Sequence, residues 1–197
     1  MKGSKVAVLG STRGSSLQPV IDAIESGNLN AEIAVVISNR KKSIILQRAR
    51  SHGLKANFVS SLGKTRAEFD AEVSGILREV NPDLILCIGY MRILSESFVK
   101  EWYGKAVNVH PSLLPKHRGL MDLEVHRAVL DAGDRETGCT LHFIDEEVDS
   151  GPILIQKEIP VLTNDSPESL KARVQPLEGQ AFIELIRAWP MEGRPQL

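Results

Sequence analysis

The chain has 197 residues, of which 42% are hydrophobic and 25% are charged, and its formal net charge is −1 at pH 7. This length and composition are typical of one soluble globular domain with a sizeable core. The near-neutral charge gives no reason to expect a nucleic-acid or membrane surface, and the N-terminal residues lack the long apolar run of a signal peptide. We therefore expect a cytoplasmic protein with no nucleic-acid or membrane partner, which leaves small-molecule substrates, and the sequence does not decide between a monomer and a homodimer.

Apolar runs and amphipathic stretches alternate through the first half of the chain. Three near-continuous apolar runs are typical of parallel strands covered on both faces, and they span residues 5–9, 32–38 and 83–89. Three amphipathic stretches predict helices at residues 17–24, 43–49 and 69–80, and Pro82 closes the last of them. Residues 1–110 are therefore predicted to form a parallel sheet of the βαβαβαβ type.

The loop of residues 10–16 (Gly-Ser-Thr-Arg-Gly-Ser-Ser) lies between a predicted strand and a predicted helix. Its glycines and hydroxyls can present backbone N–H groups to a phosphate, and the dipole of the following helix would add to the attraction. The loop matches neither the dinucleotide fingerprint nor a Walker loop, because no Gly-Lys-Ser/Thr follows. From the residues alone, phosphate binding and a plain strand-to-helix turn are equally good interpretations.

The most informative stretch is Val-Asn-Val-His-Pro-Ser-Leu-Leu-Pro at residues 107–115. It begins as an apolar strand, and because strand side chains alternate between faces, Asn108 and His110 point the same way. Pro111 cannot donate to a sheet ladder, so we expect the strand to end there, at the edge where open α/β sheets bind ligands. An amide donor beside an imidazole suits chemistry at a carbonyl carbon. The alternative is that both residues simply end a strand with satisfied hydrogen bonds.

Alternating polarity in the second half predicts strands at residues 137–145 and 152–160, and the connection between them carries four acids within five residues. Thr140 and His142 repeat the pattern of two polar side chains on one strand face. Asp149 precedes Ser-Gly-Pro, a turn that can fold a carboxylate back toward a strand end. Such a carboxylate would orient an imidazole and favour its charged form. The simpler interpretation is a solvated acidic turn.

A final helix is predicted to open at Ser166, the N-cap, with Pro167 in the first helical position. Pro176 falls inside this helix and should kink it or break one of its hydrogen bonds. Gln175 and Glu178 lie at the margin of the apolar stripe of the helix, and on their own they are most simply surface polar residues.

Three histidines and a carboxylate are the residues considered for a metal site, namely His110, His126, His142 and Asp149. They lack the close spacing of the usual zinc motifs. Both cysteines lie inside apolar runs and are expected to be buried thiols in a reducing compartment. We therefore expect no metal.

Taken together, these features closely resemble the phosphoribosylglycinamide formyltransferases, a family of folate-dependent enzymes of purine synthesis. The resemblance runs from Val6 to Trp189, and its segments follow the family's order at residues 10–18, 89–94, 108–115 and 142–152. It implies a single formyltransferase domain over residues 1–197, of α/β class, with a mostly parallel twisted sheet, helices on both faces, a Rossmann-like fold and an antiparallel C-terminal part. Residues 1–110 would form the nucleotide-binding half, and residues 111–197 the half with the folate loop and C-terminal helix.

The resemblance implies that a formyl group moves from the co-substrate 10-formyltetrahydrofolate to the primary amine of glycinamide ribonucleotide, without a metal. Attack on the formyl carbon would give a tetrahedral intermediate. Asn108 would donate to its oxyanion, and His110 would act as a proton donor or as an imidazolium. Asp149 would help to take the proton from the attacking amine, through water.

The resemblance also assigns two groups of binding residues. The ribonucleotide would contact Gly14, Ser15 and Ser16 through its phosphate, with Gln175 and Glu178 beside the rest of the molecule. The folate would contact Arg66, Met91, Arg92, Ile93, Leu94, Asn108, Asp145, Glu146, Glu147, Val148 and Asp149. Arg66 would meet the carboxylates of the folate's glutamate tail.

The chain departs from the common form of the family at several positions. The segment between Gly119 and His126 is longer, Ser16 stands where asparagine is frequent, and Arg13 is an unusual addition beside the phosphate loop. Two other interpretations stay open: another formyl-folate enzyme, such as a formyltetrahydrofolate hydrolase or a sugar-nucleotide formyltransferase, or a non-catalytic module that binds nucleotide or folate.

Overall fold

The computed structural model describes residues 3–190, and within them seven strands form one sheet in the order β3-β2-β1-β4-β5-β6-β7. The strands are β1 (Ser4–Leu9), β2 (Ala31–Ser38), β3 (Ala56–Phe58), β4 (Leu84–Cys87), β5 (Ala106–His110), β6 (Glu136–Phe143) and β7 (Ile153–Pro160). β1 to β5 pair in parallel, whereas β6 runs antiparallel to β5 and β7 antiparallel to β6. The predicted class, an α/β fold with an antiparallel C-terminal part, is confirmed.

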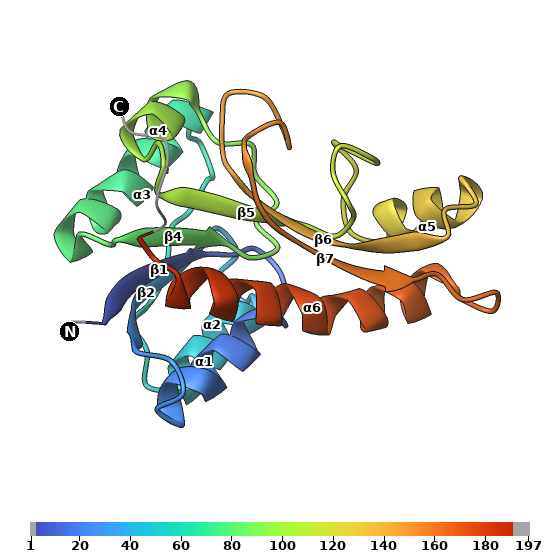
Figure 1. The fold of residues 1–197 in the computed structure, drawn as a ribbon. Helices are drawn as coiled ribbons and strands as arrows, with labels where there is room; N and C mark the ends of the chain where they lie inside the picture. The colour runs from blue at the N-terminus through green and yellow to red at the C-terminus, as the bar shows by residue number, and fades with distance from the viewer. Residues whose placement is uncertain (1–2, 191–197) are drawn as a thin grey trace.

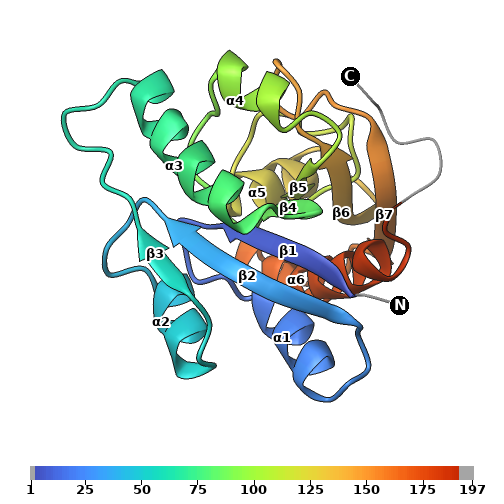
Figure 2. The same ribbon diagram turned by 90° about the vertical axis from the view of Figure 1, so that its left-hand side faces the viewer.

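Helices cover both faces of the sheet (Figures 1 and 2). They are α1 (Leu17–Glu25), α2 (Ile44–Ser51), α3 (Arg66–Val80), α4 (Glu96–Glu101), α5 (Leu123–Asp131) and α6 (Pro167–Arg187). Because strand side chains alternate, Val6 and Val8 enter the core beneath α1, α2 and α6, whereas Ala7 and Leu9 enter the core beneath α3 and α4. The near-continuous apolar runs of the sequence thus contribute side chains to the hydrophobic cores on both faces of the sheet.

Three elements, β3, α4 and α5, lie in segments where no strand or helix was predicted. β3 has three residues and α4 has six, so neither is long enough to show a hydrophobic period. Two predicted strands also end early. The run at residues 83–89 leaves the sheet after Cys87, and Gly89 turns the chain with a φ of 55°, while the run at 137–145 ends at Phe143.

Helix α6 begins as predicted and continues further than the internal proline suggested. The hydroxyl of Ser166 accepts from the backbone N–H of Ser169, and Pro167 occupies the first turn. The helix runs as one element past Pro176 to Arg187, although a proline removes one backbone donor. Packing against α1, α5, β6 and β7 holds this long helix along the sheet (Figure 1). Within residues 3–190, no helix has both the length and the apolarity needed to cross a bilayer.

Candidate active site

The pairing of β5 with β6 brings four polar side chains to one face of the sheet. Asn108 lies opposite His142, and His110 lies opposite Thr140. Directly opposite residues of an antiparallel pair share a face, so the two predicted polar pairs form one cluster. Thr140 has an anchoring role in it: its hydroxyl donates to the carbonyl oxygen of Ser112 at 2.7 Å and accepts from the N–H of Leu114 at 3.0 Å. The other three side chains remain available at the end of β5.

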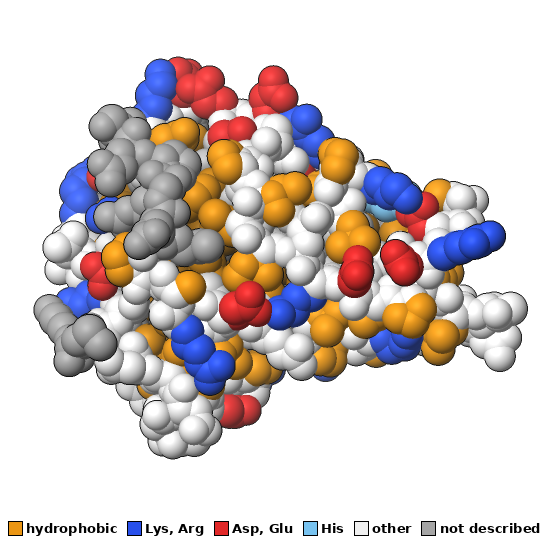
Figure 3. All heavy atoms as spheres, in the orientation of Figure 1, with side chains coloured by type: hydrophobic (Ala, Val, Ile, Leu, Met, Phe, Trp, Pro, Cys, Tyr) orange, Lys and Arg blue, Asp and Glu red, His pale blue; other side chains and the backbone are white. Residues whose placement is uncertain are grey.

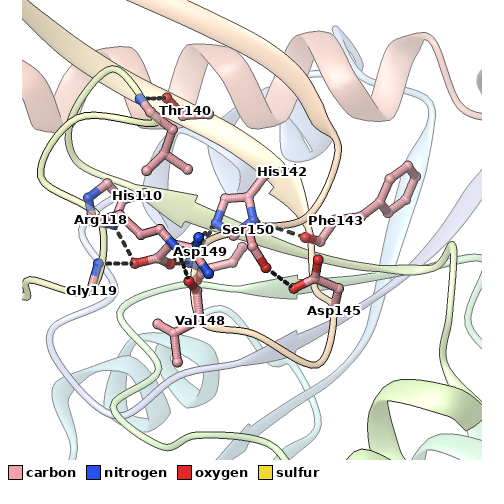
Figure 4. Close-up of polar contacts among 12 residues, drawn as sticks. His110, Arg118, Gly119, Thr140, His142, Phe143, Asp145, Val148, Asp149 and Ser150 are labelled. Atoms are coloured by element: carbon pink, nitrogen blue, oxygen red, sulfur yellow. Dashed lines mark hydrogen bonds and ion pairs between the residues drawn. The ribbon is translucent and has the colours of Figure 1, made fainter.

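The carboxylate of Asp149 lies between the imidazoles of His110 and His142 (Figure 4). Its Oδ2 is 3.2 Å from Nδ1 of His110, and its Oδ1 is 3.5 Å from Nε2 of His142. The side-chain amide of Asn108 donates to Oδ1 at 3.4 Å, and the backbone N–H of Gly119 donates to Oδ2 at 3.0 Å. The loop after β6 therefore returns a carboxylate to the strand end, as the Ser-Gly-Pro turn suggested.

This environment keeps Asp149 ionised. Its side chain is only 8% exposed, and burial by itself would raise the pKa of a carboxyl group. Hydrogen bonds from His110 and His142, the charge of His110 and the N–H of Gly119 outweigh that effect and lower the pKa of Asp149 well below its usual range. The residue also has a positive φ of 54°, a conformation that is uncommon outside glycine.

His110 faces hydrogen-bond acceptors at both ring nitrogens. Nδ1 meets the ionised carboxylate of Asp149, and Nε2 lies 3.1 Å from the backbone carbonyl oxygen of His117. Neither acceptor can donate, so only the doubly protonated imidazole satisfies both contacts. His117 in turn has a φ of 58°, and its ring lies 2.7 Å from the carboxylate of Asp134. The ring of His110 is therefore held from both sides.

Two features that the sequence did not predict hold the Asp149 loop in place. Arg118 donates from Nε to the carbonyl oxygen of Val148 at 2.6 Å and from Nη2 to Glu147 at 2.8 Å. A Cβ atom at Gly151 would lie 1.9 Å from the carbonyl oxygen of Phe143, so the turn requires glycine. Arg118 is an isolated arginine in a loop, and no periodic pattern marks it in the sequence.

A single cavity extends from this cluster across the carboxyl edge of the sheet and is lined by residues from both halves of the chain. It includes every predicted catalytic and binding residue except Arg66, namely Gly14, Ser15, Ser16, Met91, Arg92, Ile93, Leu94, Asn108, His110, Asp145, Glu146, Glu147, Val148, Asp149, Gln175 and Glu178. Arg66 is exposed at the first residue of α3 and does not line the cavity.

The end of the cavity beside α1 contains the loop of residues 10–16. Gly14 has a φ of 62°, and a Cβ atom there would lie 2.4 Å from Cγ1 of Ile45. The hydroxyl of Ser16 does not cap α1 but donates to the carboxyl group of Glu178, whose pKa is raised by burial. Gln175 and Glu178 are therefore not surface residues, because α6 turns both of them into the cavity.

The cavity also includes side chains that the sequence did not assign to a site. These are Arg13, Met121, Asp122, His126 and Lys171. His126 is buried, and burial followed by the nearby charge of Lys171 lowers its pKa to about 4. His142, to which the sequence analysis assigned no catalytic or binding role, is the second imidazole on Asp149.

Within the described residues, no group of three or more histidine, cysteine or acidic side chains has an arrangement that would hold a metal ion. Both cysteines are buried free thiols, as predicted, and burial raises the pKa of Cys87 to about 12. On the face shown in Figure 3, acidic and basic side chains are interspersed among apolar ones.

Comparisons with known proteins identify relatives of this chain. Residues 4–186 match the family described as formyl transferase. Phosphoribosylglycinamide formyltransferase of Haemophilus influenzae is 40% identical over 194 residues, which cover 98% of this chain and 90% of that protein. The crystal structure of glycinamide ribonucleotide transformylase 1 from Symbiobacterium toebii has a TM-score of 0.91 at 35% identity and covers 98% of this chain and 92% of that one.

A longer relative matches equally well over a small part of its length. The trifunctional purine biosynthetic protein adenosine-3 of Drosophila melanogaster is 43% identical over 181 residues, which are 90% of this chain and 13% of that protein. The chain therefore spans about an eighth of this relative, whereas it spans 90% of the bacterial one.

Proposed function

The chain belongs to the formyl transferase family, and from that premise we propose that it moves the formyl group of 10-formyltetrahydrofolate to the primary amine of glycinamide ribonucleotide, as a cytoplasmic enzyme of purine biosynthesis. The observation that carries the proposal is the contact of Asp149 with His110 and Asn108 at the centre of one cavity. A general base, a proton donor and an amide donor then meet where a formyl carbon can lie between two substrates.

The chemistry requires charge stabilisation and movement of one proton. The amine nitrogen attacks the formyl carbon, and the carbonyl oxygen becomes an oxyanion, to which Asn108 donates a hydrogen bond. His110 donates from Nε2, which leaves the carbonyl oxygen of His117 when the substrates bind. The carboxylate of Asp149 takes the proton that the amine loses, through water. His110 gives a proton to the leaving N10 of the folate as the bond from carbon to that nitrogen breaks. The proton on Asp149 then passes to His110 and restores its protonated form. Each such group contributes ~3 kcal/mol to the barrier reduction in comparable sites.

The two ends of the cavity suit the two substrates. The α1 end offers the backbone of Gly14, Ser15 and Ser16 at a helix N-terminus, which suits a phosphate. The carboxyl group of Glu178, which accepts from Ser16 of that loop, and the amide of Gln175 line the same cavity as His110, and in the proposal they hold the glycinamide portion so that its amine reaches the formyl group.

The other end suits a flat heterocycle. Residues 91–94 and 145–149 present backbone groups beside apolar side chains, the arrangement expected of a pterin site. Arg66 lies outside this cavity, so in the proposal it meets only the glutamate tail of the folate, which would project into solvent.

The test is to mix the purified protein with 10-formyltetrahydrofolate and to follow deformylation by absorbance, with and without glycinamide ribonucleotide. We expect deformylation only when the ribonucleotide is present. Deformylation without it would identify a hydrolase, and no reaction under either condition would contradict the proposal.

A further inference from the structure

An ion pair lies in the wall of the cavity, where the start of α6 packs beside α5. Lys171 of α6 donates from its ammonium to the carboxylate of Asp122, which precedes α5 in the longer segment after Gly119. Lys171, Gln175 and Glu178 are spaced four and three residues apart, so they lie on one side of α6. All three line the cavity, as does Asp122. The pair is therefore part of the cavity wall.

The conformation of Asp122 is not explained by its place in the fold. It occupies the N-cap position of α5, where aspartate normally accepts a hydrogen bond from the first turn, but its side chain makes no capping bond. Its backbone has a φ of 53° and a ψ of −127°, a region that residues other than glycine rarely occupy. Strained residues of this kind gather at ligand sites. Here the carboxylate of the strained residue pairs with Lys171.

The ammonium of Lys171 is the cation that this pair can offer to an anion in the cavity. His126, which also lines the cavity, is uncharged at neutral pH because its pKa is lowered. The side chain of Asp122 is 58% exposed and that of Lys171 is 32% exposed, so the carboxylate can turn into solvent while the ammonium stays at the cavity. Pairs this exposed are weak and easily exchanged.

We propose that Lys171 binds the phosphate of the ribonucleotide, and that the carboxylate of Asp122 pairs with the ammonium of Lys171 only while the substrate site is empty. The inference rests on the proposed function and adds a specificity residue to the same site. Ser16 connects the phosphate loop to Glu178 on the side of α6 that also carries Lys171. A phosphate dianion has more charge and more acceptor oxygens than one carboxylate, so it displaces Asp122 from the ammonium.

The experiment compares substitutions on the two sides of the pair by calorimetric titration with the ribonucleotide, in the absence of folate. Lys171→Met removes the cation, and we expect the Kd to rise about tenfold. Asp122→Asn removes the competitor, and we expect the Kd to fall about two- to threefold. Opposite changes of the Kd in the two variants would show that phosphate and Asp122 compete for Lys171. If the ion pair only held the structure together, its loss would weaken binding in both variants.

A matched control and a second ligand make the result specific. Lys157→Met breaks the ion pair of Lys157 with Glu184, a residue of α6. These two side chains are exposed to a similar degree (26% and 56%) but do not line the cavity, so this variant should leave the Kd unchanged. Glycinamide ribonucleoside, which lacks the phosphate, should bind Lys171→Met and the unaltered protein equally well. Thermal unfolding of each variant confirms that it is folded.

Equal weakening in both variants, no change in either, or an equal loss with the ribonucleoside would each overturn the inference. If the unaltered protein did not bind the ribonucleotide at all, the proposed function itself would be contradicted. The failure of the inference and the failure of the function are therefore distinguishable.

Discussion

Nδ1 of His110 lies 3.2 Å from Oδ2 of Asp149, although one residue ends a strand and the other follows the next strand. The contact depends on two further backbone interactions. The carbonyl oxygen of His117 holds the opposite nitrogen of the ring, and the N–H of Gly119 holds the carboxylate. The loop after β5 thus fixes both members of the pair, and its contacts have consequences that can be measured.

Arg118 is expected to position Asp149. Arg118→Ala removes the hydrogen bonds to the carbonyl oxygen of Val148 and to Glu147, and we expect kcat to fall about tenfold, because small displacements of a catalytic group are costly. Glu147→Gln is the matched control, since it weakens only the second contact and should have a smaller effect. Steady-state kinetics of both variants provide the measurement. Equal losses in the two variants would show that the bond to Val148 does not matter.

Gly14 is expected to be required by both its backbone and its surroundings. In Gly14→Ala, the positive φ costs about 1–2 kcal/mol, and the close approach to Ile45 adds about 1–3 kcal/mol from overpacking. Gly53 has a φ of 68° with no atom within 4 Å of a Cβ, so Gly53→Ala carries only the first cost. Denaturant unfolding gives the two stabilities, and the KM for ribonucleotide should rise only in Gly14→Ala. Similar behaviour of the two variants would refute this account of the loop.

The raised pKa of Glu178 predicts a pH-dependent stability. A carboxyl group whose pKa is higher in the folded protein stabilises the fold fully below its unfolded pKa, and this contribution is lost as the pH rises through the folded pKa. The side chain in Glu178→Gln cannot ionise, so the stability of this variant does not fall with pH for this reason. The free energy of unfolding of the variant relative to the unaltered protein should therefore increase from pH 4 to pH 8, by about 1.4 kcal/mol for each unit by which the pKa is raised. Denaturant unfolding at both pH values measures this, and a constant difference would contradict the burial of the charge.

Much of the fold follows from local patterns, and the reasons are visible in particular residues. Val6 and Leu9 belong to a continuous apolar run because both faces of β1 are covered. The i, i+2 spacing of Asn108 and His110 predicted a shared face, and the register of β5 with β6 places His142 on it too. The elements β3 and α4 were missed because they are shorter than a detectable period.

The rest of the site depends on tertiary contacts that local sequence does not encode. Within residues 3–190, four residues other than glycine have positive φ; two of them, Asp122 and Asp149, line the cavity, and a third, His117, holds the ring of His110 through its carbonyl oxygen. Their conformations are held by contacts to distant residues, such as Asp134 and Lys171, rather than by local preference. Glu178 resembled a surface residue in the sequence because only the packing of α6 shows that it faces the cavity.

The most direct test of the central claim is the rate of formyl transfer by Asp149→Asn, measured in a single turnover with both substrates saturating. The amide keeps the shape of the side chain but removes the charge between His110 and His142. We predict that both substrates bind within about threefold of their normal affinity, while transfer slows by at least about 100-fold, the usual contribution of a positioned acid or base. Transfer at the normal rate from pH 6 to pH 9 would contradict the role of Asp149 in moving the proton.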